Sequence, residues 1–177
     1  MLVDRMDALE ALVEKYIESA IIQGRECWGG DVKLANKHSL MLTEYYCDLC
    51  MFGKKGLDAL SNLLYHENAY VRLNAAFDLL PFRSRESAKA LRALLRERSE
   101  ISLRAENALI MWGKGLSRFA VKRNGEITDV SAKELVCYLQ TEWAKQGEDF
   151  GGLYAHKRHG RNTLSHYIRV LREYIRK

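Results

Sequence analysis

The sequence predicts an all-α protein: a solenoid of helical hairpins, followed by a small β-hairpin and a two-helix C-terminal extension. Three observations support this fold class. The 177 residues include one proline, Pro81, and an all-β sandwich needs many more turn breakers. Apolar residues recur three and four positions apart over most of the first 113 residues, as in amphipathic helices. Two adjacent segments are similar at an offset near thirty residues.

The chain begins with a predicted hairpin of two long helices. A stripe of apolar residues predicts a helix from Asp4 to about Gln23. The glycine-rich stretch 25–30 is typical of a loop, and Asp31 can cap a second helix that runs to about Phe52. At this chain length we expect helical repeats over residues 1–114 and an extension packed on them over residues 115–177.

Four shorter helices follow as two similar hairpins. We expect them over residues 56–65, 69–80, 87–98 and 101–112, with Pro81 ending the second because it lacks a backbone donor. Three leucines of the first of these hairpins recur 31 residues later in the second. An arginine and an alanine of its second helix recur 32 residues later. One such unit cannot bury its apolar face alone, so neighbours stack and expose a curved surface, the usual binding face of solenoids. The matched residues are Leu60, Leu63, Leu64, Arg72 and Ala76 with Leu91, Leu94, Leu95, Arg104 and Ala108.

The extension has three local signals. Asn124 and Gly125 lie between β-prone runs and predict a tight hairpin over residues 119–128, since a type I′ turn needs positive φ at both centres. Ser131 and Glu134 form a capping box that predicts a helix to about Gln146. A loop over residues 148–161 and a final helix from residue 163 complete the extension, which we expect to cover the open end of the repeat stack.

Charge is distributed in blocks along the chain. The 28 Lys and Arg against 23 Asp and Glu give a net charge of +5. Residues 83–123 carry +7 and residues 156–177 carry +6, whereas residues 1–31 and 124–155 carry −4 each. Such blocks steer association with charged partners. The basic segments predict nucleic-acid binding as an alternative function, through Lys157, Arg158, Arg161, Arg169 and Arg172.

Two groups of residues raise the question of metal binding. Cys47 and Cys50 form a lone C-x-x-C pair, and a zinc site needs a second pair or histidines at matching spacing. We interpret both cysteines as small core residues. Three histidines at positions 156, 159 and 166 bind a transition metal where their side chains converge. We expect no cofactor, and the sequence leaves a metal at these two groups open.

The sequence contains no recognisable catalytic motif. Gly29, Gly30 and Asp31 precede a helix but lack the lysine of a phosphate loop, and neither G-x-S-x-G nor H-E-x-x-H occurs. We therefore expect a protein that is not an enzyme and has no small-molecule substrate. The start of the chain lacks a secretory signal, and the longest apolar run is too short to span a bilayer. We expect a cytoplasmic protein without a membrane partner.

The second helix of each repeat supplies the predicted binding face. Arg72 and Arg104 lie at equivalent positions near helix starts, so we interpret both as rungs of a ladder of hydrogen bonds between repeats. Residues four apart on the polar side of these helices are candidate interface positions, and aromatic side chains supply hot spots. The predicted partner-binding residues are Tyr70, Asn74, Phe77, Asp78, Glu106 and Ile110.

Residues 60–76 also carry a resemblance to a known family. Their pattern, L-x-x-L-L-x-H-x-N-x-x-V-R-x-x-A-A, resembles a HEAT-type repeat, and residues 8–113 are similar to a bacterial HEAT-like family of unknown function. The resemblance implies that genes of this family occur near genes of polymorphic toxins. Proteins encoded there commonly act as immunity proteins. We therefore expect an immunity protein that neutralises a cognate toxin by direct binding. The acidic segments suit a basic toxin, and the basic segments suit an acidic toxin. The sequence leaves the sign of the toxin's charge open.

Overall fold

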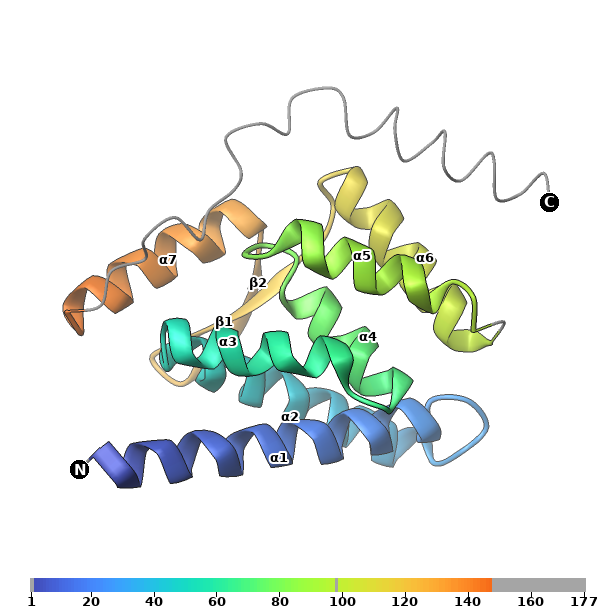
Figure 1. Cartoon of the computed structure of the whole chain (residues 1–177), viewed down its shortest axis with the longest axis horizontal. Helices are drawn as coiled ribbons and strands as arrows, with labels where there is room; N and C mark the ends of the chain where they lie inside the picture. The colour runs from blue at the N-terminus through green and yellow to red at the C-terminus, as the bar shows by residue number, and fades with distance from the viewer. Residues whose placement is uncertain (1, 98, 148–177) are drawn as a thin grey trace.

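The structure, a computed structural model, describes residues 2–97 and 99–147. Within this part of the chain it contains seven α-helices, one 3-10 turn and one two-stranded antiparallel sheet (Figure 1). The predicted all-α fold with a small β-hairpin is therefore confirmed. The loop over 148–161 and the final helix lie outside the described residues. None of the described helices is both long enough and apolar enough to cross a lipid bilayer.

Helices α1 (Leu2–Glu26) and α2 (Val32–Met51) form the predicted first hairpin and lie side by side along one edge of the molecule (Figure 1). Asp31 caps α2 as expected. Its Oδ1 accepts hydrogen bonds from the backbone nitrogens of Lys33 and Leu34, at 2.8 and 3.2 Å. These bonds satisfy two of the donors that a helix start otherwise leaves unpaired.

Helix α3 (Lys54–Asn62) continues as the 3-10 turn η1 (Leu63–Tyr65) and is followed by α4 (Ala69–Asp78). The helix α3 begins two residues before the predicted start, because Gly53 adopts a φ of 67° and turns the chain directly out of α2. A Cβ atom at Gly56 would lie 1.8 Å from the carbonyl oxygen of Leu49. Only glycine at this position lets α3 lie so close to the backbone of α2.

The last repeat consists of α5 (Ser84–Leu94) and α6 (Glu100–Gly113). The predicted helix over 87–98 is shifted, since α5 begins three residues earlier and ends four residues earlier. The chain after α4 closes in a tight turn in which the backbone nitrogen of Arg83 donates to the carbonyl of Leu79 at 2.8 Å. Phe82, 3% exposed, anchors this turn in the core, so the next helix can start at once.

Helix α4 occupies the centre of the helical layers and packs against α1, α5 and α6 (Figure 1). Its Ala75 and Ala76 are fully buried, and these small side chains allow the neighbouring helices to approach closely. The contacts differ from one hairpin to the next, because α1 lies against α2, α3 and α4, whereas α6 lies against α4 and α5. The described helices thus pack as hairpins around α4 without the uniform contacts of a regular solenoid.

Strands β1 (Phe119–Arg123) and β2 (Glu126–Val130) form the predicted hairpin, with Phe119 opposite Val130. Asn124 and Gly125 adopt φ values of 52° and 84°, as a type I′ turn requires. Helix α7 (Ala132–Lys145) follows, and the Ser131 hydroxyl and the Glu134 carboxylate form the predicted capping box.

The extension folds back onto the first hairpin. Both β1 and α7 pack against α2. The indole of Trp143, fully buried, donates a hydrogen bond from Nε1 to the carbonyl of Cys50 at 2.8 Å. At the start of β1, Phe119 stacks on Phe77 of α4, with ring centroids 5.3 Å apart. The part of the extension that is described therefore packs beside α2 and α4, and Phe119 also contacts Trp112 of α6. The expectation that the whole extension covers the open end of the repeat stack also involves the final helix, which lies outside the described residues.

Candidate binding groove

Two cavities lie side by side where α4 and α6 face the start of β1. Their volumes are about 480 Å³ and 230 Å³. We call the larger one the α6 cavity, because residues of α6 line it, and the smaller one the α2 cavity, because residues of α2 line it. The two cavities together are called the groove. Four residues line both cavities: Asn74, Phe77, Arg104 and Arg118.

The α6 cavity combines apolar walls with two cations. Leu73 and Phe77 of α4 face Ala108 and Met111 of α6 across it, and Leu116, 53% exposed, forms its rim. Its remaining lining is polar: Asn74, Arg104, Asn107, Ser117 and Arg118.

The two guanidinium groups of the groove have few hydrogen-bond partners, although their charges act on carboxylates nearby, Arg118 on Glu134 and Arg104 on Glu100. Arg118 is exposed and forms no ion pair with any described residue. Arg104 donates from Nη1 and Nη2 to Oε1 of Gln23, but at 3.4 and 3.5 Å, near the limit for a hydrogen bond. Most of the donors of both side chains therefore remain available to a bound molecule.

Ser117 adds a buried hydroxyl to the same cavity. The residue is 7% exposed, and its Oγ is buried without a hydrogen-bond partner among the described residues. A buried polar group without a partner costs about 1–3 kcal/mol, so such groups are rare in native proteins.

Asp78, which lines the α2 cavity, forms an acid–phenol pair with Tyr16. The hydroxyl of Tyr16, fully buried in α1, donates to Oδ2 of Asp78 at 2.7 Å. Burial raises the pKa of Asp78 to about 7, and the hydrogen bond from Tyr16 only partly opposes this shift. Burial, with the negative charge of Asp78 as a second cause, raises the pKa of Tyr16 well above its usual value. Near neutral pH, Asp78 is thus close to its midpoint of ionisation.

The six predicted partner-binding residues do not form one surface. Asn74, Phe77 and Asp78 line the groove. Tyr70 lies elsewhere, because its ring occupies the place of a side chain at Gly24 of α1: a Cβ atom there would lie 2.2 Å from the ring. Glu106 and Ile110 are half-buried on α6 and line neither cavity.

The residues of α6 that do line the groove are Arg104, Asn107, Ala108 and Met111. We placed Glu106 and Ile110 there by translating the exposed positions of α4 along the repeat. Translation copies the same side of each helix, whereas a groove between two helices is lined by sides that face each other. Asn107 and Met111 each follow one of the predicted residues, Glu106 and Ile110, by one position. These two later positions lie on the side of α6 that lines the groove.

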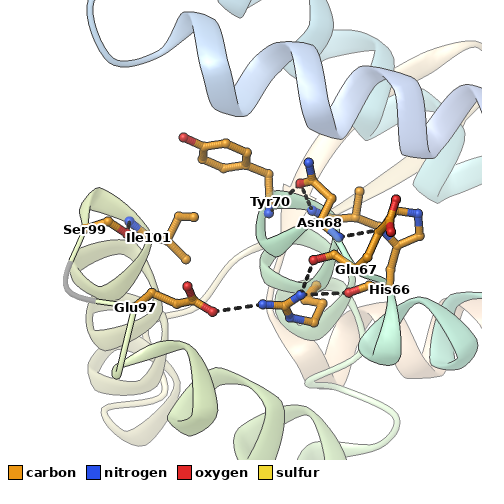
Figure 2. Close-up of polar contacts among 9 residues, drawn as sticks. His66, Glu67, Asn68, Tyr70, Glu97, Ser99 and Ile101 are labelled. Atoms are coloured by element: carbon orange, nitrogen blue, oxygen red, sulfur yellow. Dashed lines mark hydrogen bonds and ion pairs between the residues drawn. The ribbon is translucent and has the colours of Figure 1, made fainter.

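The two equivalent arginines also differ in their roles. Arg72 joins two repeats, as predicted: it donates to the carbonyls of His66 and Glu67 at 2.8 and 2.6 Å and to Glu97 at 3.0 Å. Figure 2 shows Glu97, after α5, pointing toward the segment that precedes α4. Arg104 also donates hydrogen bonds to another hairpin, at Gln23 of α1, but these bonds are longer, and its side chain lines the groove as well.

The candidate nucleic-acid residues, Lys157, Arg158, Arg161, Arg169 and Arg172, lie outside the described residues, as do the three C-terminal histidines. Part of the other basic segment is used within the protein. Arg83 forms an ion pair with Asp58, and Lys122 forms one with Asp48 at 3.3 Å. Arg123 lies over the ring of Tyr138, 4.8 Å from its centre.

Cys47 and Cys50 are core residues, 5% and 2% exposed. Burial raises the pKa of Cys47 to about 12 and that of Cys50 well above its usual value, so both remain thiols. Among the described residues, no three His, Cys, Asp or Glu side chains are grouped so that they could hold a metal ion.

Compared with models of known protein families, with curated proteins and with solved structures, the chain matches none of them. The geometry of the groove and the resemblance noted in the sequence are therefore the basis for a functional proposal.

Proposed function

We propose that the chain is a non-catalytic protein-binding module that holds its partner in the groove. We further propose that the partner is a toxin, which a cytoplasmic bacterial immunity protein of this kind neutralises by direct binding. The observation that carries the binding role is the α6 cavity: a hollow of about 480 Å³ with apolar walls and two guanidinium groups that have few hydrogen-bond partners. The toxin as partner is supported by the HEAT-like pattern of residues 8–113.

The composition of the groove suits a protein partner. Interfaces gain most of their binding energy from a few central apolar, aromatic and arginine side chains that become fully desolvated. Phe77, Met111 and Leu116 provide the apolar part, and Arg104 and Arg118 provide the arginines. Methionine is unbranched and adapts to the shape of the side chain that packs on it.

Co-expression with the product of the neighbouring toxin-like gene tests this function. We expect a stable complex on co-purification and protection of the cells from the toxin. Arg118→Glu, which reverses a charge in the groove, is expected to weaken both. Lys89→Glu on the exposed face of α5 makes the same charge change away from the groove and is expected to have no effect. A toxin that neither binds the wild-type protein nor is neutralised by it contradicts the proposal.

Nucleic-acid binding remains the alternative because of the two basic segments. Its test is the dependence of affinity on salt, measured with a duplex and a single-stranded oligonucleotide. Binding that neutralises several phosphates weakens steeply between about 50 and 200 mM salt. Affinity with this steep dependence supports the alternative, and undetectable or salt-independent binding removes it.

A further inference from the structure

We infer that the α6 cavity is an anchor site for a bulky apolar side chain of the partner together with an adjacent carboxylate. The partner segment is therefore acidic and apolar. This inference rests on the proposed protein-binding function and specifies which chemistry the groove recognises.

The size and walls of the cavity account for the apolar part. A volume of about 480 Å³ lies within the range of about 300–1,000 Å³ typical of pockets that bury a ligand. Leu73, Phe77 and Met111 form an apolar interior, and the exposed Leu116 extends it to the surface. Covering these groups removes apolar surface from water, which favours an apolar side chain over a purely charged ligand.

The charges account for the carboxylate. Arg104 and Arg118 line the cavity, and no acidic residue does so among the described residues. The guanidinium fork matches two carboxylate oxygens, and such bonds are about twice as strong as those between neutral groups. In addition, Arg104 is half-buried beside the apolar walls, where the local dielectric is lower, so its attraction to a carboxylate is stronger than at an open surface.

The positions of the acidic residues of the groove fix the orientation of the bound segment. Asp78 and Asp129 line the α2 cavity and not the α6 cavity. The acidic group of the partner is therefore directed to the α6 cavity, away from these two carboxyl groups.

A pair of peptide probes tests the inference without the natural partner. The first is acetyl-Gly-Glu-Phe-Glu-Gly-amide, and the second replaces both Glu by Gln. Dissociation constants are measured by titration of the isotopically labelled full chain, following backbone amide signals. We expect the Glu peptide to bind at least tenfold more tightly than the Gln peptide and to shift the signals of the groove.

Three variants assign the binding to the cavity. Arg118→Gln is expected to weaken the Glu peptide about tenfold and to leave the Gln peptide unchanged. Met111→Trp fills the cavity and is expected to weaken both peptides. Lys89→Gln on α5 is the matched control and is expected to bind like the wild type. Arg118 is exposed, so its variant is expected to fold even if Met111→Trp does not.

The inference is overturned if neither peptide binds, if both bind equally, or if Arg118→Gln binds the Glu peptide as tightly as the wild type. The inference is also overturned if an oligonucleotide, added at a lower concentration than the Glu peptide, displaces that peptide from the groove. If the peptides fail while the toxin still binds, the anchor chemistry is wrong and the proposed function stands. If the peptides behave as expected but no toxin binds, the anchor site stands and the immunity function falls.

Discussion

Helices α4 and α6 occupy equivalent places in two similar repeats, but equivalent side chains on the two helices have different partners. At the start of α4, Arg72 donates three hydrogen bonds of 2.6–3.0 Å, whereas the equivalent Arg104 of α6 makes two long ones. At the far end, Asp78 accepts a hydrogen bond from Tyr16 of α1, and Ile110 stands at the corresponding position of α6.

The difference lies in how the polar side chains of the two helices are used. The polar groups of α4 are largely used to hold the repeats together (Figure 2). The polar groups that α6 presents to the groove, Arg104 and Asn107, are mostly left for another molecule. Similarity between repeats therefore predicts where a side chain is placed and not which partner it has.

The largest expected effect lies at the far end of α4 and is tested by pH. Asp78 has a pKa of about 7 in the folded protein and an ordinary value near 4 when unfolded, so the folded state binds a proton that the unfolded state lacks between these values. Its contribution to stability therefore falls as pH rises from about 4 to about 7 and then stays low. Asp78→Asn is expected to be about 4 kcal/mol more stable than wild type at pH 8 and nearly equal to it at pH 4, since one pKa unit corresponds to about 1.4 kcal/mol. Thermal unfolding across this range measures the difference, and a constant difference contradicts the assignment.

The next largest expected effect separates the two arginines. Arg72→Met removes three hydrogen bonds from a charged donor, two of them to backbone carbonyls, and is expected to lower the free energy of unfolding by about 3 kcal/mol. Arg104→Met is expected to lower it by about 0.5 kcal/mol or less, because its bonds are long. Urea unfolding of the two variants measures both values. Equal destabilisation would show that the two helices are tied equally.

The helix caps give a smaller contrast. Asn68 accepts hydrogen bonds from the backbone nitrogens of Tyr70 and Val71, at 2.9 and 3.4 Å, whereas Ser99 accepts one, from Ile101 at 3.3 Å. Asn68→Ala is expected to cost about 1–2 kcal/mol and Ser99→Ala about 0.5–1 kcal/mol. Urea unfolding of both variants, with Ser102→Ala as an additional comparison on α6, measures these costs. A larger loss for Ser99→Ala would reverse the proposed order.

The elements that sequence reasoning predicted well are those with local signals. The cap at Asp31, the capping box at Ser131 and the turn at Asn124 each depend on bonds between residues within four positions of one another. The predicted start of α5 was wrong, because the turn after Pro81 depends on the burial of Phe82 in the core, and no neighbouring residue indicates that burial.

The groove was predicted only in part, for a related reason. Asn74, Phe77 and Asp78 lie on one side of α4, which periodicity can identify. Arg118 and Ser117 lie in a connecting segment whose place is set by the packing of β1 against α2 and by the stacking of Phe119 on Phe77. Neither composition nor spacing carries that information.

The sequence by itself determined the helices, the turn and most of their ends, because these depend on apolar periodicity and on hydrogen bonds within a few residues. Only the tertiary structure decided which faces meet and which side chains remain without partners. Arg104 and Gln23 are 81 residues apart, and the distance between them follows from the packing of every helix between them. The same packing brings α4, α6 and the start of β1 together and creates the groove.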